Sequence, residues 1–188
     1  MEIITESWLE EMLQLCQQKD VGMVGAKLYY PDDTIQHAGV VVGLGGVAAH
    51  VLCKLPRDAE GYMGRLRCVQ EISAVTAACM MVKTSVFKAV GGFDEELKVA
   101  FNDIDLCMKV RKYGVKIVFT PYAELYHYES KSRGMEDTPE KQLRFSREVN
   151  CFRRKWEREL LKGDPYYNPN LTLNNTDCSL RKQEKNGD

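Results

Sequence analysis

The sequence predicts an α/β fold in which a mixed, mostly buried sheet is flanked by helices. First, segments with helical periodicity alternate with strand-like apolar runs along the chain. Second, the run over residues 71–82 is apolar with small residues, which is typical of a strand buried on both faces. Third, 188 residues with 44% hydrophobic and 28% charged side chains are typical of one globular domain with its own core.

The first part of the chain is expected to contain a helix and two strands. Residues 5–18 carry one apolar stripe, and Ser7 with Glu10 has the spacing of a capping box at a helix start. A strand over residues 21–30 follows. Residues 35–46 begin as a second strand and end in a glycine-rich loop, and the charged stretch after them is expected to be a surface loop.

The middle of the chain is expected to add one strand and two helices. Residues 71–82 form the strand. A short helix follows, with Thr84 as its N-cap and glycines 91–92 at its end. Residues 102–113 form the next helix, and Gly114 is expected to end it because glycine tolerates the left-handed conformation found there.

The last third is expected to form a strand over residues 115–120, ended by a proline, and then a long helix over residues 138–161. Thr138 and the proline after it are typical of a helix start. The apolar residues of this helix recur at spacings of three or four, which predicts one buried face: Phe145, Val149, Phe152, Trp156 and Leu160. We expect one domain over residues 1–173 and a disordered tail over residues 174–188.

Composition excludes several classes of function. The 26 basic and 27 acidic residues nearly cancel, so global charge does not favour binding to nucleic acid or to an anionic membrane. No apolar run approaches the roughly 20 residues that cross a bilayer, and the first residues lack the pattern of a signal peptide. The seven cysteines are scattered and contain no CxxC pair, which favours a reducing cytoplasm over a zinc site or disulfide framework.

The start of the helix over residues 102–113 raises the main question about function. Asn102, Asp103 and Asp105 lie within its first turn. Such side chains usually accept hydrogen bonds from backbone N–H groups that have no partner at a helix start. A reactive carboxylate, kept ionised by the helix dipole, is the alternative. The local sequence leaves both interpretations open.

Other candidate ligand residues lie in two loops. Gly45 and Gly46, followed by His50, indicate either a turn with positive φ or a close approach of the backbone to a ligand. His127 lies at the end of a strand-like segment, where open α/β sheets usually bind ligands, and Arg133 follows it. A hydrogen-bonded structural histidine and a solvated arginine are the alternatives.

Several motifs occur in one order along almost the whole chain. They are VGAKLYYPDDTIQHAGVV, GGVAAH, SAVTAACMMVKTSVFKAVGGFDE, AFNDIDLCMKVRKYG, TPYAELYHYESKSRG and DPYYNPNL. Together, over about residues 2–173, they closely resemble the C-terminal, acceptor-side half of bacterial family 2 glycosyltransferases with the GT-A fold. Such enzymes build surface polysaccharides from nucleotide-sugar donors and saccharide or lipid-linked acceptors.

This resemblance implies roles for the candidate residues. Asp103 takes the position of the family's general base, which removes the proton of the attacking sugar hydroxyl, and Asn102 then caps the helix. His127 takes a position near the diphosphate and a divalent metal, Mn²⁺ or Mg²⁺. We assign the remaining candidates to substrate binding, together with Asn102: Asp105, Gly45, Gly46, His50 and Arg133. The implied reaction inverts the sugar configuration, in the cytoplasm or at the inner face of the membrane.

The resemblance covers only part of such an enzyme. The DxD motif that holds the metal would precede the first predicted helix, and none is found there. We therefore expect this chain to bind nucleotide sugars weakly, and to self-associate through edges left bare on the strands over residues 21–30 and 71–82. A non-catalytic module that binds saccharides or a partner protein is the alternative function.

Overall fold

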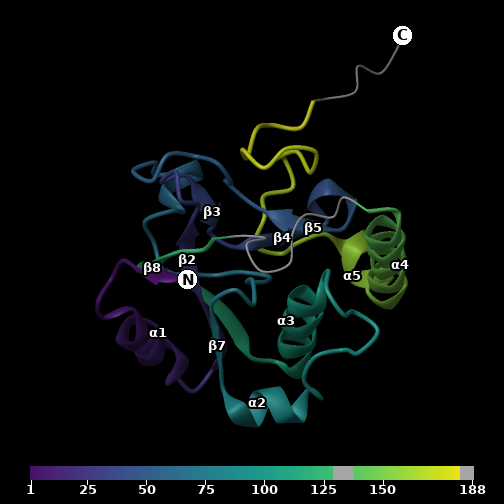
Figure 1. Ribbon diagram of the computed structural model, residues 1–188, viewed down its shortest axis with the longest axis horizontal. Coiled ribbons are helices and arrows are strands. Elements are labelled where there is room, and N and C mark those ends of the chain that lie inside the picture. The colour runs from purple at the N-terminus through teal and green to yellow at the C-terminus, as the bar shows by residue number, and fades with distance from the viewer. Residues whose placement is uncertain (129–137, 183–188) are drawn as a thin grey trace.

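A computed structural model describes residues 1–128 and 138–182 of the chain. Its main sheet has six strands, and Figure 1 shows it between α1 and α3. The four strands in its main path lie in the order β1 (Glu2–Ile3), β8 (Lys116–Tyr126), β2 (Val21–Tyr29) and β3 (Ile35–His37). Two further strands pair outside this path, β6 (Gln70–Glu71) with β8 and β7 (Met80–Val82) with β2.

The sheet is mixed, because β2 and β8 are parallel and the other pairs are antiparallel. A separate two-stranded sheet joins β4 (Val40–Val42) to β5 (Ala48–His50). The helices are α1 (Trp8–Cys16), α2 (Thr84–Ala89), α3 (Asn102–Tyr113), α4 (Pro139–Lys155) and α5 (Glu157–Lys162), with short 3₁₀ turns at Leu44–Gly46 and Tyr62–Gly64. The predicted α/β class is confirmed.

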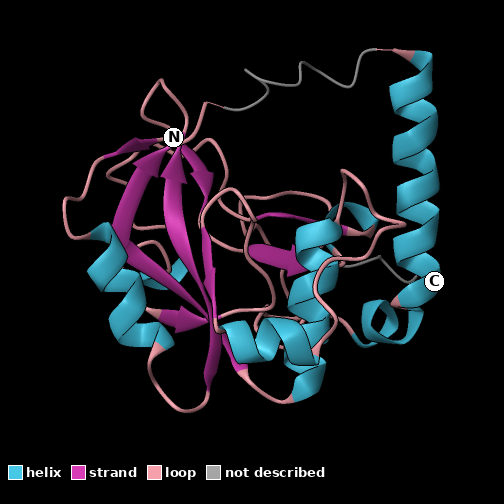
Figure 2. Cartoon of the chain, turned by 60° about the horizontal axis from the view of Figure 1, so that its bottom comes forward, coloured by secondary structure: helices cyan, strands magenta, loops and turns pink. Residues whose placement is uncertain are grey.

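The sheet separates two apolar layers, because successive side chains of β2 point to opposite faces. Val24 and Leu28 pack with Met12 of α1 on one face. Met23 and Tyr29 belong to the larger cluster on the other face, which includes side chains of α3 and α4. Figure 2 shows α4 beyond α3, at the far end from α1. The strand predicted over residues 21–30 is confirmed as β2, and every residue of β2 is buried.

The segment over residues 71–82 is not one strand, so this prediction is wrong. It pairs with β8 at Gln70–Glu71, leaves the sheet, and returns as β7 beside β2. Between the two strands Ala74 pairs with Val40, and Val75 packs tightly against the backbone of Gly25. The small buried residues of this segment let it pass close to β2 and β4, and they do not form one continuous strand.

The strand predicted to end at a proline continues to Tyr126. Pro121 lies inside β8, where the pairing with β2 shifts: Gly25 pairs with Phe119, but Lys27 pairs with Glu124. Such a bulge leaves the residues around the proline out of the ladder, so the missing N–H group does no harm there.

Helix ends agree with the sequence in part. Gly114 ends α3 in the left-handed conformation, and the Thr138 side chain caps α4, as predicted. Ser7 makes no capping hydrogen bond, and Thr84 is the first helical residue of α2 rather than its N-cap. The helix predicted over residues 138–161 is two helices, which meet at Trp156.

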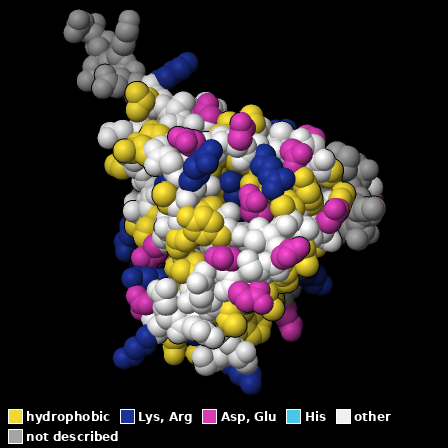
Figure 3. Space-filling model, turned by 90° about the vertical axis from the view of Figure 1, so that its left-hand side faces the viewer, with side chains coloured by type: hydrophobic (Ala, Val, Ile, Leu, Met, Phe, Trp, Pro, Cys, Tyr) yellow, Lys and Arg dark blue, Asp and Glu magenta, His cyan; other side chains and the backbone are white. Residues whose placement is uncertain are grey.

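The structure also corrects two expectations, one about a disordered tail and one about an unpaired strand edge. The predicted tail is packed over residues 174–182, where Leu180 pairs with Leu171 and Cys178 is buried. The β2 strand has no bare edge, because β3, β7 and β8 pair with it on its two sides. On the face in Figure 3, hydrophobic side chains lie in small groups between charged ones.

The crossing at Gly25 leads to a first prediction. A Cβ atom at this position would lie 2.3 Å from Cγ1 of Val75, so Gly25→Ala must displace a buried side chain. We expect the free energy of unfolding in urea to fall by about 1–3 kcal/mol. Adding Val75→Ala should recover part of this loss, because it removes the clashing methyl groups. Strictly additive effects of the two substitutions would contradict the proposed clash.

Candidate functional site

Asp103 lies at the start of α3, with its carboxylate held by two backbone N–H groups. Oδ2 accepts a hydrogen bond from the N–H of Ala77 at 3.0 Å, and Oδ1 accepts one from the N–H of Ile104 at 2.9 Å. The predicted capping role of Asn102 is wrong, because Phe101 is the N-cap of α3 and no side chain makes a capping hydrogen bond there. Asn102 is the first helical residue, and its side chain accepts from the N–H of Asp103 at 2.7 Å, which satisfies one N–H group of the helix start. The half-buried Asp103 carboxylate is thus fixed in orientation but remains accessible to solvent.

The segment before α3 is attached to α4. Glu148 of α4 is 3% exposed, and its carboxylate accepts hydrogen bonds from the N–H groups of Val99 and Ala100 at 3.2 and 2.8 Å. Phe101 has a positive φ of 62° and packs against Phe152 with ring centroids 5.4 Å apart. Phenylalanine rarely adopts the left-handed backbone conformation, and these contacts hold Phe101 in it. They fix the backbone from which Asp103 projects.

Asp105 points into the protein rather than toward the Asp103 site. Its side chain is 0% exposed, and Oδ1 accepts a hydrogen bond from the indole of Trp156 at 2.8 Å. Lys155 Nζ lies 2.8 Å from Oδ1, and Lys109 Nζ lies 3.1 Å from Oδ2 without hydrogen-bond alignment. The predicted substrate contact of Asp105 is therefore not supported, because its carboxylate is enclosed and joins α3 to α4.

His37 and His50 form a pair next to the Asp103 site. Their Nδ1 atoms are 3.0 Å apart, and Nε2 of the fully buried His37 accepts from the N–H of Thr76 at 3.4 Å. With Nε2 as acceptor, Nδ1 of neutral His37 carries the proton and donates it to His50. The next residue, Ala77, holds Asp103. The predicted site residue His50 is thus connected to Asp103 through one short backbone segment.

The His37 environment gives a pH-dependent prediction. Burial, and then the nearby His50, hold the pKa of His37 well below its ordinary value of 6.5. The unfolded chain takes up a proton near that pH and the folded chain does not, so stability present above pH 6.5 is lost on acidification. We expect unfolding free energy to fall by up to about 1.4 kcal/mol per pH unit below pH 6.5. His37→Gln should reduce this slope in urea titrations between pH 7 and 5; an unchanged slope would contradict the assignment.

The predicted glycine loop lies apart from Asp103, against α4 and the C-terminal segment. The N–H of Gly45 donates to the carbonyl oxygen of Leu173 at 2.8 Å, and Arg153 of α4 donates to the carbonyl oxygen of Gly46 at 3.2 Å. Both glycines have positive φ and are exposed. The turn interpretation is confirmed, while a ligand contact of these glycines stays a prediction.

His127 extends the main sheet at the end of β8. Its N–H donates to the carbonyl oxygen of Tyr29 at 2.9 Å, and its Nδ1 lies 2.8 Å from Oε1 of Gln36, which fixes the ring. Metal-bound histidines commonly have such a second contact, so the ring fits one ligand position. Among residues 1–128 and 138–182, however, no group of three potential metal ligands occurs. Arg133 lies outside the described residues.

Sequence reasoning missed the residues that organise the Asp103 site. The N–H of Ala77 carries no side-chain signal, and Glu148 lies on a different helix far along the chain. His37 could be recognised only as one of three histidines, because its pairing with His50 depends on the β4–β5 pairing that sets His50 opposite Val40. Gln36, on the neighbouring position of β3, orients His127 and was likewise not identified.

The described helices include none that is both long and apolar enough to span a bilayer. This agrees with the absence of a long apolar run in the sequence.

Comparison with known proteins supports one family. Residues 2–147 match the family described as "Glycosyltransferase like family 2". An uncharacterized protein of Sinorhizobium fredii, y4gI, is 57% identical over 180 residues, covering 95% of this chain and 20% of that protein. The O-antigen biosynthesis protein RfbC of Myxococcus xanthus is 39% identical over 189 residues, covering 100% of this chain and 14% of that protein.

A third relative matches a shorter segment. The N-acetylglucosaminyl-diphospho-decaprenol L-rhamnosyltransferase of Mycobacterium tuberculosis is 36% identical over 62 residues, covering 33% of this chain and 20% of that protein. The chain thus spans a fifth or less of the length of these relatives. The mixed sheet flanked by helices is consistent with a GT-A-like domain, and the family match covers most of the chain. The chain belongs to the family 2 glycosyltransferases.

Proposed function

We propose that this chain provides the acceptor-activating side of an inverting glycosyltransferase, with Asp103 as its general base. The observation that supports this most directly is the placement of Asp103. It lies in the motif position of the family's base, half-buried, with its carboxylate oriented by the N–H groups of Ala77 and Ile104. Each oxygen retains a lone pair that can accept a proton.

In the proposed reaction, Asp103 accepts the proton of an acceptor hydroxyl while the hydroxyl oxygen attacks the anomeric carbon of the donor sugar. A new glycosidic bond forms as the bond from that carbon to the nucleotide diphosphate breaks. The electron pair leaves with the diphosphate, and the proton remains on Asp103. Attack from the face opposite the leaving group inverts the configuration of the sugar.

The names of two relatives support the proposed substrate class. One relative is named an O-antigen biosynthesis protein. Another is named an L-rhamnosyltransferase that acts on N-acetylglucosaminyl-diphospho-decaprenol. We therefore assign a nucleotide-sugar donor and a saccharide or lipid-linked acceptor, used in surface polysaccharide synthesis. A lipid-linked acceptor would bring the enzyme to the inner membrane surface.

A divalent cation, when bound, supplies charge neutralisation for the diphosphate leaving group. We assign His127 as the residue of this chain that contacts it, because Gln36 fixes the ring at the end of β8.

The test is the configuration of the product. The complete protein is incubated with a panel of nucleotide sugars, Mn²⁺ and lipid-linked acceptors, and the new glycosidic linkage is analysed by NMR. We expect the anomer opposite to that of the donor. A product that retains the donor configuration would refute the proposed mechanism, and a complete protein that binds saccharides without turnover would support the non-catalytic alternative.

A further inference from the structure

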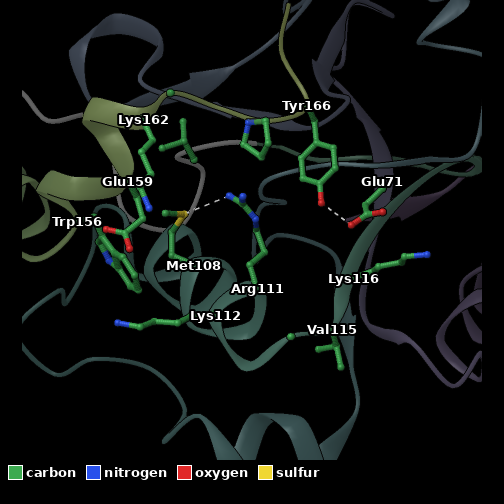
Figure 4. A pocket seen from close by; sticks show the side chains of 14 residues that line it. Glu71, Met108, Arg111, Lys112, Val115, Lys116, Trp156, Glu159, Lys162 and Tyr166 are labelled. Carbon is green, nitrogen blue, oxygen red and sulfur yellow. Dashed lines mark hydrogen bonds between the residues drawn. The ribbon is translucent and has the colours of Figure 1, made fainter.

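A pocket of about 620 Å³ lies at the C-terminal end of α3, away from Asp103. We call it the basic pocket. Eight residues of an α-helix separate Asp103 from Arg111, which corresponds to about 12 Å along the helix axis. Its walls come from α3, from α5 with the residues after it, and from the segment around β6 (Figure 4). The acceptor site proposed above does not include it.

Charge is concentrated in this pocket. Four basic side chains line it against two acidic ones, with Arg111, Lys112, Lys116 and Lys162 facing Glu71 and Glu159. Lys116 is paired with Asp20 at 2.8 Å. Arg111, Lys112 and Lys162 form no ion pair with any residue in the described part of the chain. All three lie in the last turn of a helix, Arg111 and Lys112 in α3 and Lys162 in α5, where a cation also interacts favourably with the helix C-terminus.

The wall opposite α3 is built by the DPYY motif, which the Asp103 chemistry does not use. Oδ2 of Asp164 accepts from the N–H of Val42 at 2.8 Å, and its Oδ1 accepts from the N–H of Tyr166 at 2.9 Å. Arg65 donates to the carbonyl oxygen of Tyr166 at 2.9 Å. The hydroxyl of Tyr166 donates to Glu71, which lies on the same side of the pocket in Figure 4. Segments far apart in sequence therefore hold one ring in place.

Arg111 lies in the middle of the group in Figure 4. Its Nη1 donates to Oγ of Ser73 at 3.1 Å, and its guanidinium carbon lies 5.5 Å from the centre of the Tyr166 ring. Lys112 Nζ lies 6.0 Å from the Trp156 ring. The arginine is thus held in place while several of its five N–H donors remain for a ligand.

These groups together favour one class of ligand. Aromatic and aliphatic surface from Tyr166, Met108 and Pro165 suits the C–H face of a sugar ring, and the carboxylate of Glu71 or Glu159 suits its hydroxyls. The three cations without ion pairs require an anion, which Arg111 can hold through two parallel N–H bonds. A purely apolar ligand would leave these charges desolvated.

We propose that the basic pocket is a second saccharide site, which binds a sugar residue bearing a carboxylate or a phosphate. The ring rests on Tyr166, the anion lies between Arg111, Lys112 and Lys162, and Glu71 and Glu159 accept hydrogen bonds from hydroxyls. The basic pocket would thus recognise an acidic glycan at the C-terminal end of α3, whereas the proposed base Asp103 lies at the start of this helix. Ligand binding in the basic pocket does not require Asp103.

The test measures binding to the full chain by NMR titration with amide shifts. Four probes are compared: glucuronic acid, glucose 1-phosphate, neutral glucose and inorganic phosphate. We expect at least one acidic sugar to bind at least tenfold more tightly than glucose and inorganic phosphate, with shifts at Arg111, Val115 and Tyr166. Binding of glucuronic acid alone or glucose 1-phosphate alone would identify the preferred anion.

A pair of variants locates the site. Lys112→Gln with Lys162→Gln removes two exposed cations of the pocket and should weaken binding of the acidic sugar at least tenfold. Lys19→Gln with Lys88→Gln makes the same change of net charge at exposed positions outside the pocket, and should leave binding unchanged. Equal loss in both variants, equal binding of neutral glucose or inorganic phosphate, or shifts centred on Ala77 and Asp103 would each overturn the proposal.

Discussion

Asp103→Asn is expected to lower turnover of the complete protein by about 100-fold or more, with little change in the free energy of unfolding. An amide has no basic oxygen that can take the hydroxyl proton, so the chemical step loses its base. The fold should tolerate the change, because the amide oxygen can still accept the hydrogen bond from the N–H of Ile104 that Oδ1 of Asp103 accepts at 2.9 Å. The amide nitrogen cannot accept from the N–H of Ala77 as Oδ2 does at 3.0 Å, and the loss of this half-exposed bond should cost about 1 kcal/mol.

Two measurements separate this effect from general damage. Urea unfolding reports stability, and steady-state transfer of the radiolabelled sugar reports kcat and KM. We expect the loss in kcat rather than in the donor KM, because the proposed base acts on the acceptor hydroxyl. Asp58→Asn, at an exposed position in the loop after β5, is the matched control and should keep normal turnover. Turnover of Asp103→Asn within a few-fold of the unmodified protein would exclude the base role.

Asp105→Ala is expected to destabilise the protein by about 3–5 kcal/mol. The substitution removes a fully buried carboxylate from Lys109, Lys155 and Trp156. Lys155 keeps its ion pair with Asp94, but the partly buried ammonium group of Lys109 loses its counter-ion. Removing one partner of a buried ion pair destabilises a protein by far more than the intact pair stabilises it, because the remaining charges stay desolvated.

An exposed ion pair in the same protein provides the control. Asp20 pairs with Lys116 at 2.8 Å, and both side chains are about half exposed. Asp20→Ala should therefore cost less than about 1 kcal/mol. Urea unfolding of the two variants under one set of conditions compares them directly. Equal destabilisation by Asp20→Ala and Asp105→Ala would show that Asp105 does not hold α3 against α4 as inferred.

Sequence patterns predicted correctly those features that depend only on residues close together in the chain. The apolar run of β2, the glycine that ends α3 and the Thr138 cap of α4 each act over a few residues, so the sequence reveals them. The crossing at Val75 and the bulge around Pro121 depend on which strands become neighbours. Pairing of strands far apart in sequence leaves no local signal, so both were mispredicted.

The candidate site shows the same limit. Asp103 and Asp105 are indistinguishable as neighbouring acids at a helix start, and only the arrival of Trp156 and Lys155 from α4 decides which of them is buried. The position of Asp103 could be assigned by resemblance. Its partner could not, because a backbone N–H group is common to almost every residue.

The attachment of Glu148 to the segment before α3 has a consequence for local opening of the protein. Amide protons exchange with solvent when a cooperative unit detaches, and residues bonded to that unit share its opening free energy. The amides of Val99 and Ala100 donate to Glu148 of α4, so their hydrogen exchange should follow that of α4. Weakening α4 at any exposed position would then raise the fraction of molecules in which Asp103 is poorly oriented, without a change to any residue that contacts a sugar.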